Sequence, residues 1–253
     1  MLNEERRRAI LEVVSHDGRA LVKDLARRFR TSEVTIRKDL EVLNSHGLLH
    51  RTHGGVLPVQ GGALADPTLR EKEELHRKEK LRIGAAAASL VQDGQVVVLD
   101  SGTTTTCVAR MLRNLKNVTI ITNAVNVATE LAGAAPEVIL TGGMLRKNSF
   151  SLVGPIAEET LHRLNADILF LGVDGFDVQY GLSTPNILEA KVNRAMIDIA
   201  KRVIAVCDSS KFGRSSLSSI VPLSNIHGVI TDKQIPRQHL RALKKAGIET
   251  ILV

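Results

Sequence analysis

The sequence predicts an α/β chain in two parts: a small helical part at the N-terminus and a larger part built on a mostly parallel sheet. Three observations lead to this prediction. Apolar positions recur at helical spacing before residue 45, a stretch rich in Gly and Pro occupies residues 58–67, and from Gln95 onward short apolar runs alternate with helical segments. Strands and helices in turn imply crossover connections and a sheet that helices cover on both faces.

The segment that begins at Ser32 is predicted to be a helix with one buried and one outward face. Ser32 is a favourable N-cap, because its hydroxyl can accept a hydrogen bond from a free amide of the first turn. The apolar residues at the spacing of one helical face are Ile36, Leu40 and Leu43. Thr35, Arg37 and Lys38 fall on the other face. One side of this helix therefore packs and the other faces outward.

Two more helices are predicted before this one, over residues 4–15 and 21–29, with Thr31 in the short turn that follows. Three helices with a tight turn between the last two form a helix-turn-helix, whose final helix is sized to enter a DNA major groove. Gly47 ends the third helix, and residues 48–57 read as strand, turn and strand. A helix followed by a small hairpin predicts a winged helix.

A small helical bundle with a solvated basic face is the alternative, and the predicted wing decides against it. Residues 31–56, TSEVTIRKDLEVLNSHGLLHRTHGGV, resemble the DeoR-type helix-turn-helix of bacterial sugar-metabolism regulators, in which a TIR(R/K)DL recognition helix is followed by GLL.R.HGG. The resemblance runs across residues 2–58. Side chains expected to contact DNA bases or phosphates, whose roles the sequence does not separate, are Thr31, Ser32, Thr35, Arg37, Lys38, Arg51 and His53.

Composition and charge are compatible with this prediction without locating a site. The chain has 253 residues, enough for a small domain and one of typical size, and its formal charge of +7 suits a polyanionic partner. Residues 1–15 are charged and lack the apolar core of a signal peptide, and no run is long enough to span a bilayer, so we expect a cytoplasmic protein. Cys107 and Cys207 follow no metal-ligand pattern and are expected to be small buried or half-buried thiols.

Residues 58–67 mark a linker, and a charged helix is predicted over residues 69–90. Its EKEELHRKEK portion has both charge signs at helical spacing, which is most often a solvated face and less often a dimer-forming or interdomain helix. The predicted domains are residues 1–58 for DNA binding, 59–79 for the linker and connecting helix, and 80–253 for the second domain.

The second domain is predicted to hold seven strands and five helices. The strand candidates are residues 96–99, 118–121, 138–140, 168–171, 203–206, 229–230 and 250–253, and the helices are 104–115, 124–134, 155–164, 187–201 and 236–246. Ligands of such folds bind outside the carboxyl ends of the strands. Polar loops follow five of these strands.

The first of these loops begins at Asp100. Gly102 lets the backbone turn closely, and the amides and hydroxyls after it, at a helix N-terminus, form an anion cradle suited to a phosphate. The other four loops are residues 122–123, 141–143, 172–175 and 208–211. Five polar loops at one sheet edge predict a pocket for a polar, phosphorylated small molecule.

This half also resembles a known family. LDSGTTT, ITN, LTGG, GVDGFD, TPN..EA and DSSKFG resemble, over residues 80–232, the DeoR-type effector domain, which is similar in fold to ribose-5-phosphate isomerase and glucosamine-6-phosphate deaminase. The family implies a repressor controlled by a phosphorylated sugar of its own pathway, and GVDGFD with STPN looks most like regulators of amino-sugar use such as N-acetylgalactosamine. The resemblance implies that Ser101, Gly102, Thr103, Thr104 and Thr105 hold the phosphate beside Asp100, and that Asn123, Gly142, Gly143, Asp174, Gly175, Glu189 and Lys211 line the sugar end.

An enzyme, a sugar-phosphate isomerase or deaminase fused to a DNA-binding domain, is the alternative function. Isomerisation needs a base to move a proton and support for the developing enediolate. The isomerase family has a lysine in a Gly-rich loop after DGADE, but residues 181–186 here hold neither, and the acid is replaced by Val178. For Asp174 a turn or cap role is the structural alternative, for Glu189 a solvated helix position, and for Lys211 a surface charge.

A third class, an architectural DNA-binding protein without a ligand, is disfavoured because such a protein has no need for convergent polar loops. We expect neither metal nor cofactor. The expected partners are double-stranded operator DNA, a phosphorylated sugar and a second copy of the chain, in a homodimer or homotetramer, because symmetric regulators read paired half-sites.

Overall fold

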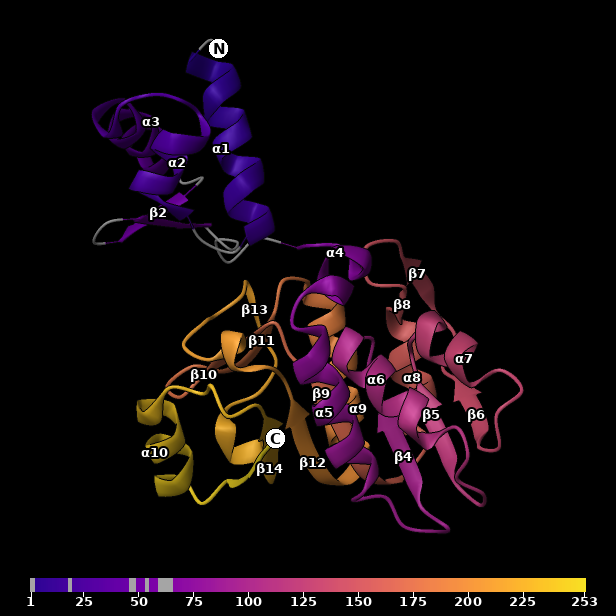
Figure 1. Ribbon diagram of the computed structural model, residues 1–253. Coiled ribbons are helices and arrows are strands. Elements are labelled where there is room, and N and C mark those ends of the chain that lie inside the picture. Colours follow the sequence, from indigo (N-terminus) through magenta and orange to yellow (C-terminus); the bar gives the residue numbers. More distant parts are fainter. Residues whose placement is uncertain (1–2, 18–19, 46–48, 53–54, 59–65) are drawn as a thin grey trace. The chain divides into compact units, whose positions relative to one another are not determined.

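The computed structural model describes residues 3–17, 20–45, 49–52, 55–58 and 66–253 (Figure 1). The chain divides into two compact units, residues 1–62 and residues 63–253. The described part of the connecting segment, from Asp66 onward, therefore belongs to the second unit.

The N-terminal unit has three helices and a three-stranded sheet. The helices are α1 (Asn3–Asp17), α2 (Val22–Arg28) and α3 (Glu33–Ser45), and the strands, in the order β1-β3-β2, are β1 (Ala20–Leu21), β3 (Gly55–Pro58) and β2 (Leu49–Thr52). The predicted helix-turn-helix and its wing are confirmed. One expectation was wrong: Leu21 does not start the second helix but lies in β1, paired with Gly55, and is exposed.

A compact apolar core holds the three helices of this unit together. Ile10, Leu25, Ile36 and Leu40 are 0–1% exposed. Complete burial of such a side chain contributes about 1.5–3 kcal/mol. The helical spacing that predicted a buried face of α3 is therefore confirmed.

A buried ion pair joins α1 to α3. Asp39, 2% exposed, accepts hydrogen bonds from Arg6 Nε at 2.6 Å and Arg7 Nε at 2.9 Å. Gly55 is required at the sheet, since a Cβ there would lie 2.6 Å from the Ala20 carbonyl oxygen. The ion pairs hold α1 against α3, and Gly55 allows β3 to pair closely with β1.

The second unit is built on a seven-stranded sheet in the order β15-β14-β12-β9-β4-β5-β6, with every neighbouring pair parallel. The strands are β4 (Val96–Leu99), β5 (Thr119–Thr122), β6 (Glu137–Leu140), β9 (Ala166–Gly172), β12 (Ala200–Val206), β14 (Gly228–Thr231) and β15 (Glu249–Leu252). All seven predicted strands are confirmed. Strand order runs one way from β4 and the other way from β9, so the topological switch point lies between these two neighbours.

Helices cover both faces of this sheet, each over its own core (Figure 1). One face packs against α5 (Arg77–Ala88), α6 (Thr103–Leu112) and α7 (Val125–Leu131), and the other against α8 (Pro155–His162), α9 (Ile187–Ile199) and α10 (Arg237–Lys245). Alternate residues of one strand serve the two cores: Ile120 belongs to the first and Ile121 to the second. The predicted three-layer α/β architecture is confirmed.

Several elements of this unit were not predicted. A hairpin of β7 (Met144–Arg146) and β8 (Ser151–Val153) lies after β6, and a small sheet combines β10 (Gly175–Asp177), β11 (Gly181–Thr184) and β13 (Ser218–Ser219). The single helix expected over residues 69–90 is two helices, α4 (Leu69–Glu74) and α5, which break where His76 adopts φ 53°. In the described part of the chain, no helix is both long and apolar enough to cross a bilayer.

Candidate functional site

The recognition helix α3 begins at the predicted cap. The Ser32 hydroxyl accepts a hydrogen bond from the Thr35 backbone N–H at 3.1 Å and lies 2.9 Å from the Thr35 hydroxyl. Val34, Arg37 and Lys38 are exposed on the outward face, where Arg37 forms an ion pair with Glu33 at 3.2 Å. This face is accessible to a DNA groove and keeps its shape through its own local contacts.

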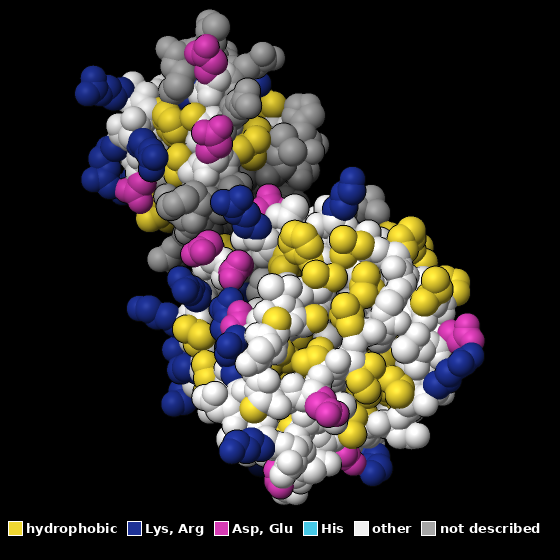
Figure 2. All heavy atoms as spheres, turned by 90° about the vertical axis from the view of Figure 1, so that its right-hand side faces the viewer, with side chains coloured by type: hydrophobic (Ala, Val, Ile, Leu, Met, Phe, Trp, Pro, Cys, Tyr) yellow, Lys and Arg dark blue, Asp and Glu magenta, His cyan; other side chains and the backbone are white. Residues whose placement is uncertain are grey.

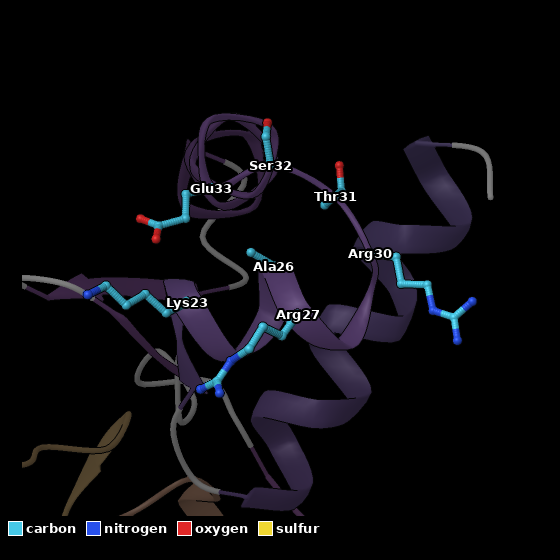
Figure 3. Close-up of a pocket in the computed structure, with 7 residues that line it drawn as sticks. All are labelled: Lys23, Ala26, Arg27, Arg30, Thr31, Ser32 and Glu33. Carbon is cyan, nitrogen blue, oxygen red and sulfur yellow. The ribbon is translucent and has the colours of Figure 1, made fainter.

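An open hollow of about 710 Å³ lies at the turn between α2 and α3. Figure 3 shows Lys23, Arg27 and Ala26 of α2 on one side of it, with Thr31, Ser32 and Glu33 across the turn, while Arg30 extends away. Lys23 and Arg27 are exposed cations one helical turn apart, next to the N-terminus of α3. Neither was predicted as a DNA contact, although their i, i+4 spacing is readable from the sequence.

The remaining predicted DNA contacts are Arg51 and His53, expected on the wing, and Thr31. Arg51 lies in β2 opposite Val56, which confirms its place on the wing, but its side chain lies outside the described residues, as does all of His53. Thr31 is half-buried in the turn before α3.

In the second unit, the switch point between β4 and β9 is built around Asp100. Asp100 is 5% exposed, and its Oδ1 accepts a hydrogen bond from the Gly172 backbone N–H at 3.0 Å. Burial raises the pKa of this carboxyl to about 7, although the bonds from Gly172 and Thr105 act in the opposite direction. A Cβ on Gly172 would lie 3.1 Å from Asp100 Oδ1, so glycine is what admits the carboxyl between the two strands.

The loop after Asp100 forms the N-terminus of α6. Ser101, Gly102 and Thr103 are half-buried at the start of this helix, where Gly102 is the N-cap. Thr105 is fully buried, and its hydroxyl both accepts from the Gly102 N–H at 2.9 Å and donates to the Asp100 carbonyl at 3.0 Å. Thr104 is 7% exposed. Thr104 and Thr105 are therefore placed to support the loop, and Ser101 to Thr103 to face a ligand.

A cation from the connecting segment occupies the carboxyl end of β9. Lys72 Nζ of α4 lies 2.7 Å from Asp174 Oδ1, and Thr184 donates to Asp174 Oδ2 at 3.3 Å. Burial acts to raise the pKa of Asp174, but the charges of Lys72 and Lys211 outweigh it and lower that pKa below its ordinary value. Asp174 is therefore an ionised site residue whose partner is a lysine outside the predicted site.

Glu189 is 7% exposed in the first turn of α9, so the solvated helix position considered as its alternative does not apply. Its carboxylate accepts from Ser151 at 2.8 Å and lies 3.0 Å from Arg146 Nη1. Arg146 in turn pairs with Asp66, just before α4. Burial acts to lower the pKa of Arg146, but the charges of Glu189 and Asp66 and the hydrogen bonds to them together raise it.

A third acid, Asp208, follows β12 and is 1% exposed. Its Oδ1 lies 3.9 Å from His76 Nε2, whereas Oδ2 has no hydrogen-bond partner among the described residues. Burial acts to raise the pKa of Asp208, but the charges of Lys211 and His76 and the hydrogen bonds from Ser210 together lower it. Lys80 of α5 is 4% exposed; burial lowers its pKa to about 8, and the charge of Asp208 limits the shift.

The other predicted ligand residues serve mainly the framework. Asn123, 1% exposed, donates to the Leu152 carbonyl at 3.1 Å, and its Oδ1 is unpaired among the described residues. A Cβ on Gly143 would lie 2.8 Å from the Val153 carbonyl, and one on Gly175 would lie 2.4 Å from Ser183 Oγ. Gly142 adopts φ 74°. These glycines allow close packing of the loops around the site.

A cavity of about 470 Å³ lies between the connecting segment, α6 and α7. Thr103 is the one predicted ligand residue that lines it, and Lys80 links it to the acid cluster. Its wall also includes Arg110, which forms an ion pair with Glu130; Arg110 Nε lies 3.0 Å from Glu130 Oε2. The cavity gives a ligand room beside the α6 N-terminus.

The structure thus brings together Asp100, Asp174, Glu189 and Lys211, and adds Lys72, Lys80, Arg146 and Asp208, none of which was predicted as a ligand residue. Within the residues that the structure describes, no group of three or more His, Cys, Asp or Glu side chains is arranged to hold a metal ion. Cys107 and Cys207 are buried free thiols, as predicted. Balanced acids and cations around a helix N-terminus can bind an anionic, hydroxyl-rich molecule.

Two family models match the chain: the DeoR-like helix-turn-helix domain over residues 6–60 and the DeoR C terminal sensor domain over residues 75–233. A protein of Escherichia coli O157:H7 that carries the name "Putative aga operon transcriptional repressor" is 42% identical to this chain. The match covers 98% of this chain and 93% of the relative's length. The regulator GlpR of Haloferax volcanii is 39% identical, over 99% and 98%. A solved ribose 5-phosphate isomerase A from Methanocaldococcus jannaschii matches with 19% identity and a TM-score of 0.41, over 68% of each chain.

Proposed function

Because the chain belongs to the DeoR family of transcriptional regulators, we propose that it is a repressor of a carbohydrate catabolic operon, controlled by a phosphorylated sugar bound in its second unit. The observation that carries this proposal is the cluster of ionised side chains around the α6 N-terminus at the sheet's switch point. An amino-sugar phosphate is the narrower proposal, from the resemblance of GVDGFD and STPN. The repressor would act on DNA in the cytoplasm.

In the first unit, α3 would enter the major groove. Thr35, Arg37 and Lys38 would reach base edges or phosphates from its outward face, and Lys23 and Arg27 would contact phosphates beside it. Phosphate contacts by Lys and Arg make such binding strongly dependent on salt.

In the second unit, the sugar phosphate would bind across the switch point. Its phosphate would bind at the α6 N-terminus beside Ser101 and Thr103, with Lys80 supplying positive charge. Its hydroxyls would donate to the carboxylates of Asp174 and Glu189. Lys211, whose charge already acts on Asp174, would complete the binding groups.

Binding at Asp174 would compete with Lys72, and this competition provides the coupling. None of the six residues of α4, all of which the structure describes, is buried. The helix is held by the Lys72–Asp174 ion pair, by the Asp66–Arg146 pair beside it, and by the bond from the Leu69 N–H to the Asn148 carbonyl at 2.6 Å. A ligand that takes Asp174 would release one of the ion pairs that hold α4.

The release of α4 would change DNA binding because of where α4 stands in the chain. The helix begins at Leu69, a few residues after the segment that leads from the wing. The extended Leu75 and the left-handed His76 form a joint between α4 and α5, so α4 can move while α5 stays in the core. By linkage, the sugar phosphate and the operator must change each other's affinity by the same factor.

We also propose that the second unit does not turn over its ligand. Residues 181–186 hold no lysine to act as a base, and Asp100 is enclosed between β4 and β9 with its carboxyl bonded to Gly172. Robust isomerisation or deamination of a sugar phosphate by the full chain would contradict this part.

The experiment is a titration of the full chain with its own upstream intergenic DNA at fixed salt, repeated with pentose, hexose and amino-sugar phosphates. One compound should shift the DNA-binding curve, and Lys211→Ala should bind DNA normally but respond less to that compound. Specific DNA binding that none of the compounds alters would contradict control by a sugar phosphate.

A further inference from the structure

An exposed apolar surface lies at one edge of the second unit's sheet, away from the acid cluster. Figure 2 shows hydrophobic side chains gathered over the face that carries β6 and the β7–β8 hairpin, with charged side chains mainly at its margins. The members of this surface, which we term the β6 edge face, are Ile139, Leu140, Met144, Leu145 and Ile156, exposed by 37, 42, 61, 50 and 66%.

These side chains form one continuous surface that wraps around the outermost strand. Ile139 is paired with Ile121, whose side chain belongs to the α8–α9 core, so Ile139 lies on that face and Leu140 on the opposite one. Ile156 is next to Gly142, since a Cβ on Gly142 would lie 3.7 Å from its Cγ2. Met144 and Leu145 follow directly in β7.

The outer edge of β6 is also open. Strand β6 pairs with β5 alone in the described part of the chain. An open, apolar edge strand can pair with another chain, and proteins normally prevent this by placing charged residues on the edge or by covering it. In this strand the charged residue is Glu137 at its start, whereas Ile139 and Leu140 at its end are apolar.

None of the five members of the β6 edge face is charged. Arg146, at the end of β7, turns inward: it is 15% exposed and paired with Asp66 and Glu189. Lys147, the next residue, is exposed. A chain of net charge +7 repels a copy of itself, so contact between two copies is favoured where the contacting side chains are uncharged. The five members of the β6 edge face are all apolar.

The exposed apolar area of the β6 edge face also favours a second copy of the chain as its partner. Soluble monomers rarely leave apolar patches beyond about 300–600 Å² uncovered. Five large side chains at these exposures, together with the strand edge, can form the core of a standard interface, which buries roughly 800 Å² on each partner. The chain has one helix-turn-helix, and a reader of paired half-sites needs two.

We propose that the β6 edge face is where two copies of this chain associate about a two-fold axis. The interface is isologous, so each copy contributes the same residues. This inference goes beyond the proposed function, because it assigns the surface that pairs two sensor units and involves none of the residues proposed to bind the sugar phosphate.

The test is sedimentation equilibrium of the full chain without DNA or sugar phosphate, comparing wild type with Leu140→Lys, Met144→Lys and Leu252→Lys. Leu252 is the matched control, because it lies at the end of β15, the opposite edge of the same sheet, and is 39% exposed against 42% for Leu140. Each of the first two changes should raise the dimer dissociation constant by about tenfold or more, and the control should leave it unchanged.

A dimer that survives both Leu140→Lys and Met144→Lys, or that is weakened equally by Leu252→Lys, would overturn the proposal, as would a monomeric wild type. Matching melting temperatures by circular dichroism establish that each variant is folded. No effector or operator takes part, so failure here leaves the repressor proposal standing, and failure of the repressor proposal leaves this one standing.

Discussion

The outward face of α3 and the acid cluster of the sensor unit both carry charge, but they hold it in opposite ways. Arg37 keeps 58% of its side chain exposed and has a partner, Glu33, from its own helix. Lys80, Glu189 and Asp208 are 4, 7 and 1% exposed, and ion-pair or charge partners of all three come from other elements.

This difference distinguishes a surface that can contact DNA without rearrangement from a site that can rearrange when a ligand binds. An exposed cation with a local partner needs no rearrangement before it meets a phosphate. A buried ion pair carries a large desolvation cost, so removing or replacing one partner has a large effect. We therefore expect the sensor to respond to a ligand through the half-buried pair of Lys72 and Asp174, and α3 to need no rearrangement.

The largest expected effect is a loss of stability in the N-terminal unit. Asp39→Ala should lower the free energy of unfolding of the N-terminal unit by about 3–5 kcal/mol, because it breaks a buried ion pair with Arg6 and Arg7. Urea unfolding measures this. Asp24→Ala, which removes the exposed pair with Arg27, is the control and should cost less than about 1 kcal/mol. Equal losses in the two variants would contradict the role given to Asp39.

The second effect concerns pH and the switch point. The pKa of Asp100 is raised from 3.8 to about 7, so the folded chain holds this proton more tightly than the unfolded chain does. Its contribution to stability is complete below pH 3.8 and is lost as the pH rises through 7. The stability of wild type minus that of Asp100→Asn should therefore fall between pH 4 and pH 7, by on the order of a few kcal/mol.

Asp167→Asn is the control for this measurement. Hydrogen bonds from Lys201 and Val96 lower the pKa of Asp167, so its contribution is present above pH 3.8 and is lost only as the pH falls below that value. Its difference from wild type should stay constant between pH 5 and pH 8. A constant difference for Asp100→Asn over the same range would show that its carboxyl is already ionised in the fold.

The third prediction tests whether the first unit binds DNA and the second unit binds the sugar phosphate independently. Arg37→Ala should weaken operator binding by about 1–3 kcal/mol, roughly 5–150-fold, and leave sugar-phosphate binding unchanged. Arg163→Ala is the matched control, since Arg163 is an exposed arginine paired at i, i+4 with Glu159, but in the sensor unit. Fluorescence anisotropy with labelled operator measures the first effect and calorimetry the second. Loss of sugar binding in Arg37→Ala would break the comparison.

The smallest expected effect is on coupling alone. Lys72→Met should still bind operator and ligand, but the ligand should change operator affinity by less than in wild type, where coupling of about 1–3 kcal/mol is typical. Lys78→Met removes an exposed lysine from α5 and should behave as wild type. A full response in Lys72→Met would exclude the ion pair with Asp174 as the coupling contact.

Much of the fold could be predicted because its signals are local. The seven parallel strands are buried on both faces, so each is a continuous apolar run, as in Val96–Leu99. The β10-β11-β13 sheet left no such signal. Its strands have two to four residues, and Ser183 pairs with Ser219 across a long stretch of chain. The break at His76 was missed because neither Gly nor Pro marks it.

The sequence indicated the polar residues that follow strands, such as Asp100 and Asp174, but it did not indicate the cations that meet them from α4 and α5. Lys72 and Lys80 lie in a charged run that looks the same whether water or a buried acid meets it. Their partners, Asp174 and Asp208, are more than 100 residues away in the chain. Helical spacing indicates which residues share a face, but it does not indicate what lies opposite.

The most direct test of the contrast is amide hydrogen exchange of the full chain, with and without the sugar phosphate that shifts operator binding. The amides of α4 should lose protection when the ligand binds, because Lys72 leaves Asp174, while those of α3 should exchange at unchanged rates. Unchanged or increased protection of α4, or a change confined to α3, would contradict the account.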